Sequence, residues 1–112
     1  MEIIKFSTNW NNKLNCTAFT TFRLHNPSKY IGGNIYDIHL KSGESYKSIC
    51  IAVIKEIKTL QLYQVDNFIS LIDTGYDQIV FISMLMVMYK NKNIDFSTQK
   101  WDHILLSKVT PL

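Results

Sequence analysis

The sequence predicts one α+β domain, and three observations support that fold class. Apolar and polar side chains alternate along several short stretches, which is typical of half-buried strands. Two later stretches instead repeat apolar residues every three or four positions, as helices do. The chain has 112 residues, of which 46% are apolar and 19% charged. This length and balance fit a single hydrophobic core, so we expect one domain over residues 1–112 with four or five strands.

The first half of the chain supplies most of the predicted strands. Ser7 to Asn9 offer N-cap oxygens to a brief helix over residues 10–14. In the strand that follows this helix, a period of two puts Thr21 and Arg23 on the same face. The strands predicted in this half are residues 1–6, 19–24, 34–40 and 46–59, the last of them long and bulged.

The second half is predicted to be mainly helical. Four apolar residues within 65–72 have the spacing of one helix face, which predicts a stripe packed on the core. They are Val65, Phe68, Ile69 and Ile72. The next helix, over residues 78–89, is apolar nearly all round, so we expect other elements to enclose it. Residues 101–109 return as the last strand, and a small barrel closed around the long helix would cover the edges of the sheet.

Charge and cysteine content limit the classes of partner and compartment. Twelve Lys and Arg against nine Asp and Glu give a net charge of +3, which permits an anionic partner but is far from the composition of an obligate nucleic-acid binder. Cys16 and Cys50 form no CxxC pair, and the first residues lack the features of an export signal, so we expect reduced thiols in the cytoplasm. The longest apolar run is about half of the roughly 20 residues that span a bilayer, so no membrane partner is expected.

Thr21 and Arg23 are the first candidates for a ligand site. Arg23 is the only arginine in the chain, and a guanidinium group binds phosphate or carboxylate through two parallel hydrogen bonds, which lysine cannot do. Because Thr21 lies on the same face of the strand, the two side chains can share one ligand. The alternative is a structural ion pair between Arg23 and either Asp37 or Asp73.

Two further candidates lie outside this strand. Lys13, on the short helix before it, is the first of them, and the alternative is a solvated surface lysine. The turn from Asp73 to Tyr76 joins the two apolar helices, and its carboxylate and phenol suit the wall of a pocket. The alternative for this turn is helix capping, which uses the same residue types.

Trp10 and Tyr76 are the aromatic candidates for stacking a base, because both flank the ends of predicted elements. The alternative is that they belong to the core. The three histidines lack the spacing of metal ligands, and the chain contains neither a Gly-rich phosphate loop nor a nucleophile elbow. We therefore expect neither a metal nor a cofactor.

Several short segments follow one another in an order that characterises a known family. They are Lys13-Leu14, Thr20-Thr21-Phe22-Arg23, Tyr30-Ile31-Gly32-Gly33-Asn34-Ile35-Tyr36, Phe68-Ile69-Ser70, Asp73-Thr74-Gly75-Tyr76, Met88-Tyr89 and the strand over residues 103–108. Together they cover almost the whole chain and resemble the ASCH domain of the PUA-like superfamily. The resemblance implies a small β-barrel of four to six strands with two or three helices at its mouth, where a cleft faces the Thr-x-Arg strand.

The resemblance also implies a function. PUA-like domains bind RNA, nucleotides or modified bases, and some small ASCH proteins are amidohydrolases that remove acyl groups from N4 of cytidine with a lysine, a threonine and a glutamate. Thr21 matches that threonine, but Ala18 stands in the place of the lysine, and only Asp73 offers a carboxylate near the place of the glutamate. We therefore expect a non-catalytic module that binds RNA, single-stranded nucleic acid or a nucleotide weakly and in a salt-sensitive way.

Two other functions remain open from the sequence. The first is an amidohydrolase acting on N4-acylated cytidine with an altered catalytic set, in which Lys13 or a water replaces the missing lysine beside Thr21 and Asp73. The second is a protein-interaction module of a mobile element. The sequence sets no expectation for the oligomeric state.

Overall fold

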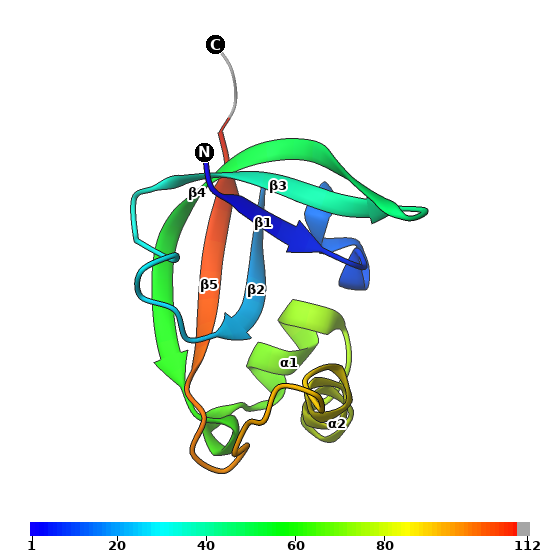
Figure 1. Ribbon diagram of the computed structural model, residues 1–112, viewed down its shortest axis with the longest axis vertical. Helices are drawn as coiled ribbons and strands as arrows, with labels where there is room; N and C mark the ends of the chain where they lie inside the picture. Colours follow the sequence, from blue (N-terminus) through cyan, green and yellow to red (C-terminus); the bar gives the residue numbers. More distant parts are fainter. Residues whose placement is uncertain (110–112) are drawn as a thin grey trace.

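The five strands of the protein form one mixed sheet, with the helices gathered beside it (Figure 1). The computed structural model describes residues 1–109. Its strands are β1 (Ile3–Phe6), β2 (Ala18–Leu24), β3 (Ile35–Ser42), β4 (Ser45–Leu60) and β5 (Trp101–Lys108). Its helices are the 3-10 helices η1 (Trp10–Asn15) and η2 (Leu62–Gln64) and the α-helices α1 (Asn67–Thr74) and α2 (Gln78–Met88).

The sheet is strongly curled. Its strand order is β1-β3-β4-β5-β2, with β1 and β3 parallel and every other pair antiparallel. β1 and β2 are the two edges, yet the rings of Phe6 on β1 and Phe19 on β2 lie 6.0 Å apart across the core. Register shifts between Ile38 and His39 and between Ile54 and Glu56 mark bulges that help the sheet to bend. The result is a half-barrel, which confirms the α+β class and a barrel-like sheet.

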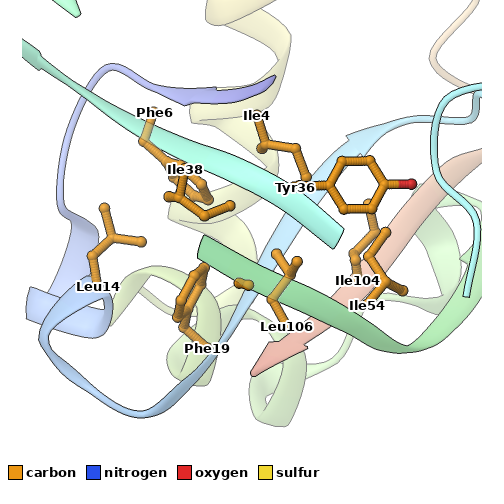
Figure 2. Close-up of a cluster of buried hydrophobic side chains, with 10 residues drawn as sticks. Ile4, Phe6, Leu14, Phe19, Tyr36, Ile38, Ile54, Ile104 and Leu106 are labelled. Atoms are coloured by element: carbon orange, nitrogen blue, oxygen red, sulfur yellow. The ribbon is translucent and has the colours of Figure 1, made fainter. Parts of the chain in front are cut away.

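The prediction of a barrel closed around the long helix is wrong. The edge strands β1 and β2 are not paired with each other, and α2 lies outside the curl, beside α1 (Figure 1). The interior is filled instead by side chains from the strands and from Leu14 on η1, which Figure 2 shows pointing toward one another. These residues are Ile4, Phe6, Leu14, Phe19, Tyr36, Ile38, Ala52, Ile54, Ile104 and Leu106.

The alternation predicted for the second strand is confirmed by a second apolar cluster. Phe22 points away from the core that contains Phe19 and packs instead against residues of the helices and β5. This cluster consists of Phe22, Leu62, Val65, Phe81, Leu85 and Trp101. β2 therefore connects two cores, one on each of its faces.

The two α-helices beside this cluster are capped by aspartates. The side chain of Asp66 accepts a hydrogen bond from the backbone amide of Ile69 and caps α1, and the side chain of Asp77 accepts one from the amide of Val80 and caps α2.

The helical stripe predicted over residues 65–72 packs on the core only in part. Val65 is buried in the second cluster and Ile69 packs against it, but the other two residues of the stripe face outward. Phe68 is 78% exposed and Ile72 59% exposed, whereas the side of α1 that packs inward carries Ser70, Asp73 and Thr74. A helix that faces a polar cavity turns its polar side inward, and hydrophobic periodicity alone cannot distinguish the two orientations.

The prediction that other elements enclose the second helix is also wrong. Only Phe81 and Leu85 of α2 are buried, and its remaining apolar side chains leave an exposed surface. Among residues 1–109 no single helix is long and apolar enough to cross a membrane, although α1 and α2 together reach that length and composition across a bend of 63°. A half-barrel of this size offers contact surface to one side of α2 and leaves the other side uncovered.

Gly75 ends α1 in the left-handed conformation, with a φ of 81°, and a Cβ at this position would lie 3.2 Å from the side chain of Asn11. We expect Gly75→Ala to lower the free energy of unfolding by about 1–2 kcal/mol, because an L side chain is strained at this φ. Gly32→Ala is the matched control, since nothing lies within 4 Å of its Cβ. Urea denaturation measures both, and an equal effect of the two changes would contradict the prediction.

His103 on β5 predicts a dependence of stability on pH. Burial lowers the pKa of His103 from 6.5. The negative charges of Asp73 and Asp66 oppose this shift, and the positive charges of Lys13 and Lys58 add to it. The Nε2 atom of the imidazole has no hydrogen-bond partner. Between its folded pKa and 6.5 the unfolded chain binds a proton that the folded chain does not, so stability falls as the pH drops below 6.5. We therefore expect the free energy of unfolding to decrease as the pH is lowered from 7.5 to 5. Denaturation of the wild type and of His103→Leu from pH 7.5 to 5 isolates this contribution, which the variant should lack.

Candidate functional site

A cavity of about 90 Å³ opens at the edge strand β2. Thr21 and Phe22 point to opposite faces of the sheet and both line it, so the cavity straddles the unpaired edge of β2. Four of the residues predicted for the site line it with their polar groups, namely Lys13, Thr21, Arg23 and Asp73. They come from η1, β2 and α1, so the fold brings α1 to two adjacent segments that lie far from it in the sequence.

Lys13 and Asp73 form a buried ion pair at the cavity. The Nζ atom of Lys13 lies 3.2 Å from Oδ1 of Asp73, and the two side chains are only 6% and 5% exposed. The hydroxyl group of Thr20 donates a second hydrogen bond to the same oxygen at 3.0 Å. The alternative of a solvated surface lysine is therefore wrong. Burial lowers the pKa of Lys13, and the attraction of Asp73 only partly offsets this effect.

The segment before β2 explains why Lys13 points inward. Asn11 and Asn12 have positive φ values of 56° and 52°, which interrupt η1, and the side chain of Asn9 accepts a hydrogen bond from the amide of Leu14 at 2.9 Å. Leu14 is anchored in the core of the curled sheet. The chain is thus held tightly on both sides of Lys13, and the lysine side chain extends toward α1.

Arg23 lies beside this pair and has no carboxylate of its own. Its Nε atom donates a hydrogen bond to the hydroxyl oxygen of Thr21 at 2.9 Å, and its Cζ atom lies 4.6 Å from the ring centre of Phe6. No ion pair of Arg23 occurs within residues 1–109, so the predicted pairing with Asp37 or Asp73 does not form. Asp37 accepts hydrogen bonds from Ser48 and His39 instead.

The electrostatic balance of the cavity is positive. Burial lowers the pKa of Arg23, and Tyr30, Tyr89 and Asp73 oppose this shift. Arg23 also lowers the pKa of Lys13, so the two cations repel each other. Two cationic groups and one carboxylate line the cavity, and Lys5 adds another ammonium group at its exposed wall. A partly desolvated positive charge without a counter-ion is stabilised by an anion.

Several polar atoms at the cavity have no partner within the described part of the chain. The terminal nitrogens of Arg23 donate no hydrogen bond there, and Thr21, which accepts from Arg23, donates none. Oδ2 of Asp73 also accepts none. The terminal nitrogens of Arg23 and Oδ2 of Asp73 are not among the buried side-chain atoms that lack a partner, so solvent can reach them. The site therefore presents both donors and an acceptor to a ligand.

The two predicted aromatic residues differ in their relation to the cavity. Trp10 lines the cavity, whereas Tyr76 does not and instead packs edge-on against Trp10 with ring centres 5.9 Å apart. The turn between the helices combines both of its expected roles. The hydroxyl of Thr74 donates to the carbonyl of Ser70 and accepts from the amide of Tyr76, while Asp73 reaches the cavity.

Sequence reasoning missed Thr20 and Phe6. The strand period places Thr20 on the opposite face from Thr21, but at an unpaired edge both faces reach the same cavity and Thr20 bonds to Asp73. Phe6 places its ring beneath both cations, 5.6 Å from Nζ of Lys13 and 4.6 Å from Cζ of Arg23. An aromatic residue at the end of the first strand carries no signal of this role in the sequence.

Ala18 is exposed at the start of β2 and does not line the cavity. The position where the family resemblance places a lysine is thus occupied by alanine, while a lysine from η1 reaches the cavity. Within residues 1–109 no group of three or more His, Cys, Asp and Glu side chains is arranged to hold a metal ion. No known family model, curated protein or solved structure matches this chain.

Proposed function

We propose that this cavity binds the anionic group of a nucleotide, or of one nucleotide at the end or in a loop of RNA or single-stranded DNA. The observation that carries the proposal is Arg23, a largely buried cation with no carboxylate partner whose terminal nitrogens remain open to the cavity. Its planar guanidinium group matches two oxygens of a phosphate. The hydroxyl of Thr21 supplies a further donor, and Lys13 adds positive charge.

The size and rim of the cavity support a single nucleotide as the ligand. A volume of about 90 Å³ holds one phosphate or the edge of one base, but not a stretch of nucleic acid. Trp10 at the rim offers a ring face to a base. The net charge of +3 adds a weak attraction that depends on salt. The free thiols of Cys16 and Cys50 fit a cytoplasmic protein.

Calorimetric titration tests this proposal with matched ligands. We expect cytidine and adenosine monophosphates to bind at least tenfold more tightly than the nucleosides, and binding to weaken as salt rises. Gel shifts with short RNA and single-stranded DNA extend the test to polymers. Equal affinity for nucleotide and nucleoside would contradict the proposal, because Arg23 would then have no anion to hold.

A second candidate function is hydrolysis of an N4-acylated cytidine, which the Lys13–Asp73 pair favours. A lysine whose pKa is lowered can accept a proton at a pH closer to neutrality, which a surface lysine cannot. In this reaction water or the Thr21 hydroxyl attacks the acyl carbon, Lys13 accepts its proton and returns it to the leaving nitrogen, and Arg23 stabilises the oxyanion. When Thr21 attacks, water then releases the acyl group.

Chromatography of N4-acetylcytidine incubated with the protein tests this second function. The expected products are cytidine and acetate. Lys13→Met and Thr21→Val should each abolish the reaction, whereas Lys47→Met, an exposed lysine on β4, should leave the rate unchanged. Product formation that survives both changes at the cavity would exclude this catalytic set.

A further inference from the structure

An open apolar groove of about 460 Å³ runs along α2 and adjoins the charged cavity. The groove and the cavity share three lining residues, Trp10, Met84 and Met88. The rest of the groove is lined by Ile79, Val80, Ser83 and Val87. The charged cavity and the apolar groove thus adjoin each other, and the residues that they share carry no charge.

The groove offers almost nothing to a polar ligand. Its only hydroxyl group, on Ser83, already donates a hydrogen bond to the carbonyl of Ile79 at 2.9 Å. No charged residue occurs in α2. Ile79 is 77% exposed and Val87 65% exposed, so the groove leaves a continuous apolar surface in water, which marks a binding surface in soluble proteins.

We propose that the ligand of this protein is a single-chain amphiphile, with an anionic head held by Arg23 in the cavity and an unbranched apolar tail lying in the groove along α2. The charges of the cavity select the head, and the apolar side chains along α2, with no charged residue among them, select the tail. This inference rests on the proposed function, because the head occupies the same cavity. Its new content is that the phosphate or acyl group of the ligand carries an alkyl chain.

The length of the groove sets the length of the tail. From Ile79 to Val87 the helix rises about 12 Å, at 1.5 Å per residue. An extended chain of about ten atoms covers that distance, since three bonds of extended backbone span roughly 3.5 Å. The proposed class of ligand is therefore a medium-chain alkyl or acyl phosphate, free or attached to a nucleotide.

A series of methyl, butyl and octyl phosphates below their micellar concentrations tests the proposal, with calorimetry or tryptophan fluorescence as the measurement. We expect the affinity to rise about twofold per methylene. This increase corresponds to half of the free energy of burying a methylene fully, because the groove is open on one side. Octyl phosphate should then bind about 16-fold more tightly than butyl phosphate.

Paired variants separate the groove from the cavity. The double change Ile79→Asn and Val87→Asn should remove the dependence on chain length and leave methyl phosphate binding unchanged. Both side chains are mainly exposed, so the fold should tolerate the change. Phe68→Asn is the matched control, because Phe68 is 78% exposed but lies outside the groove.

The outcomes distinguish failure of the groove from failure of the cavity. A dependence on chain length that persists in the double variant, or is absent from the wild type while methyl phosphate binds, overturns the amphiphile and leaves the proposed function intact. Binding of octanol as tightly as octyl phosphate, unchanged in Arg23→Met, overturns the anionic head and with it the proposed function. Binding to phosphatidic acid vesicles without binding to monomeric octyl phosphate overturns the soluble ligand.

Discussion

Replacing Asp73 by alanine is expected to lower the free energy of unfolding by about 3–5 kcal/mol, because the change leaves the ammonium group of Lys13 buried without its carboxylate. The hydroxyl of Thr20 loses its acceptor at the same time. Lys13 is only 6% exposed, so the cavity offers its ammonium group little of the hydration that it has in the unfolded chain. Urea denaturation at pH 7 measures the effect.

The control for this prediction removes both charges together. The double variant Lys13→Met and Asp73→Leu should recover most of the lost stability, because an apolar pair of similar volume needs no solvation. Glu56→Ala, at an exposed carboxylate on β4, should change the stability little. A loss below about 1 kcal/mol in Asp73→Ala, the range of exposed ion pairs, would mean that the pair is not sealed from water.

The pH dependence of Asp73→Ala gives an independent check. The folded pKa of Lys13 lies below 10.5 already in the wild type, and loss of the carboxylate lowers it further. Between that pKa and 10.5 the unfolded chain binds the proton and the folded chain does not, so the stability rises with pH. The stability of the variant should therefore approach that of the wild type as the pH increases toward 10.

Replacing Arg23 by methionine is expected to weaken nucleotide binding by about 100-fold, because a desolvated charge pair between ligand and guanidinium group is lost. The same change should not destabilise the free protein, since Arg23 has no carboxylate partner and donates its single observed hydrogen bond to Thr21. Calorimetry with a nucleoside monophosphate measures binding, and thermal denaturation measures stability.

Two comparisons make the role of Arg23 specific. Arg23→Lys keeps the charge but should recover only a small part of the affinity, because an ammonium group cannot form two parallel hydrogen bonds. Lys47→Met removes a positive charge from an exposed site and should reduce affinity only at low salt. If Arg23→Met and Lys47→Met weaken binding equally, the effect is one of net charge and the cavity is not the binding site.

The strands were predictable because their side chains alternate between two environments. Alternation located β2 and β3, and the wealth of β-branched residues located β4 as a long, bulged strand. The position of the bulge, near Ile54, is known only from the structure. The apolar residues located the helices, but they did not predict which side of each helix faces the core. Phe68 and Ile72 on α1 face outward, whereas Asp73 faces inward and pairs with Lys13, and no local pattern reveals a partner 60 positions earlier in the sequence.

The candidate site shows the same limit. Thr21, Arg23 and Asp73 were singled out from residue type and from family resemblance, and the fold gathers them with Lys13 at one cavity. The burial of Lys13 was not predictable, because it depends on the positive φ values of Asn11 and Asn12 and on the anchoring of Leu14. The absence of a partner for Arg23 is likewise a property of the whole fold.

The strand order also fixes when the binding site can form during folding. β2 carries Thr21 and Arg23, and its sheet neighbour is β5, with Ala18 opposite Ser107. Contacts between residues so distant in sequence slow the folding of small proteins. On the ribosome β2 must wait, unpaired, until β5 has emerged. We therefore expect the proposed ligand to bind only after β2 and β5 have paired, and not to an earlier folding intermediate.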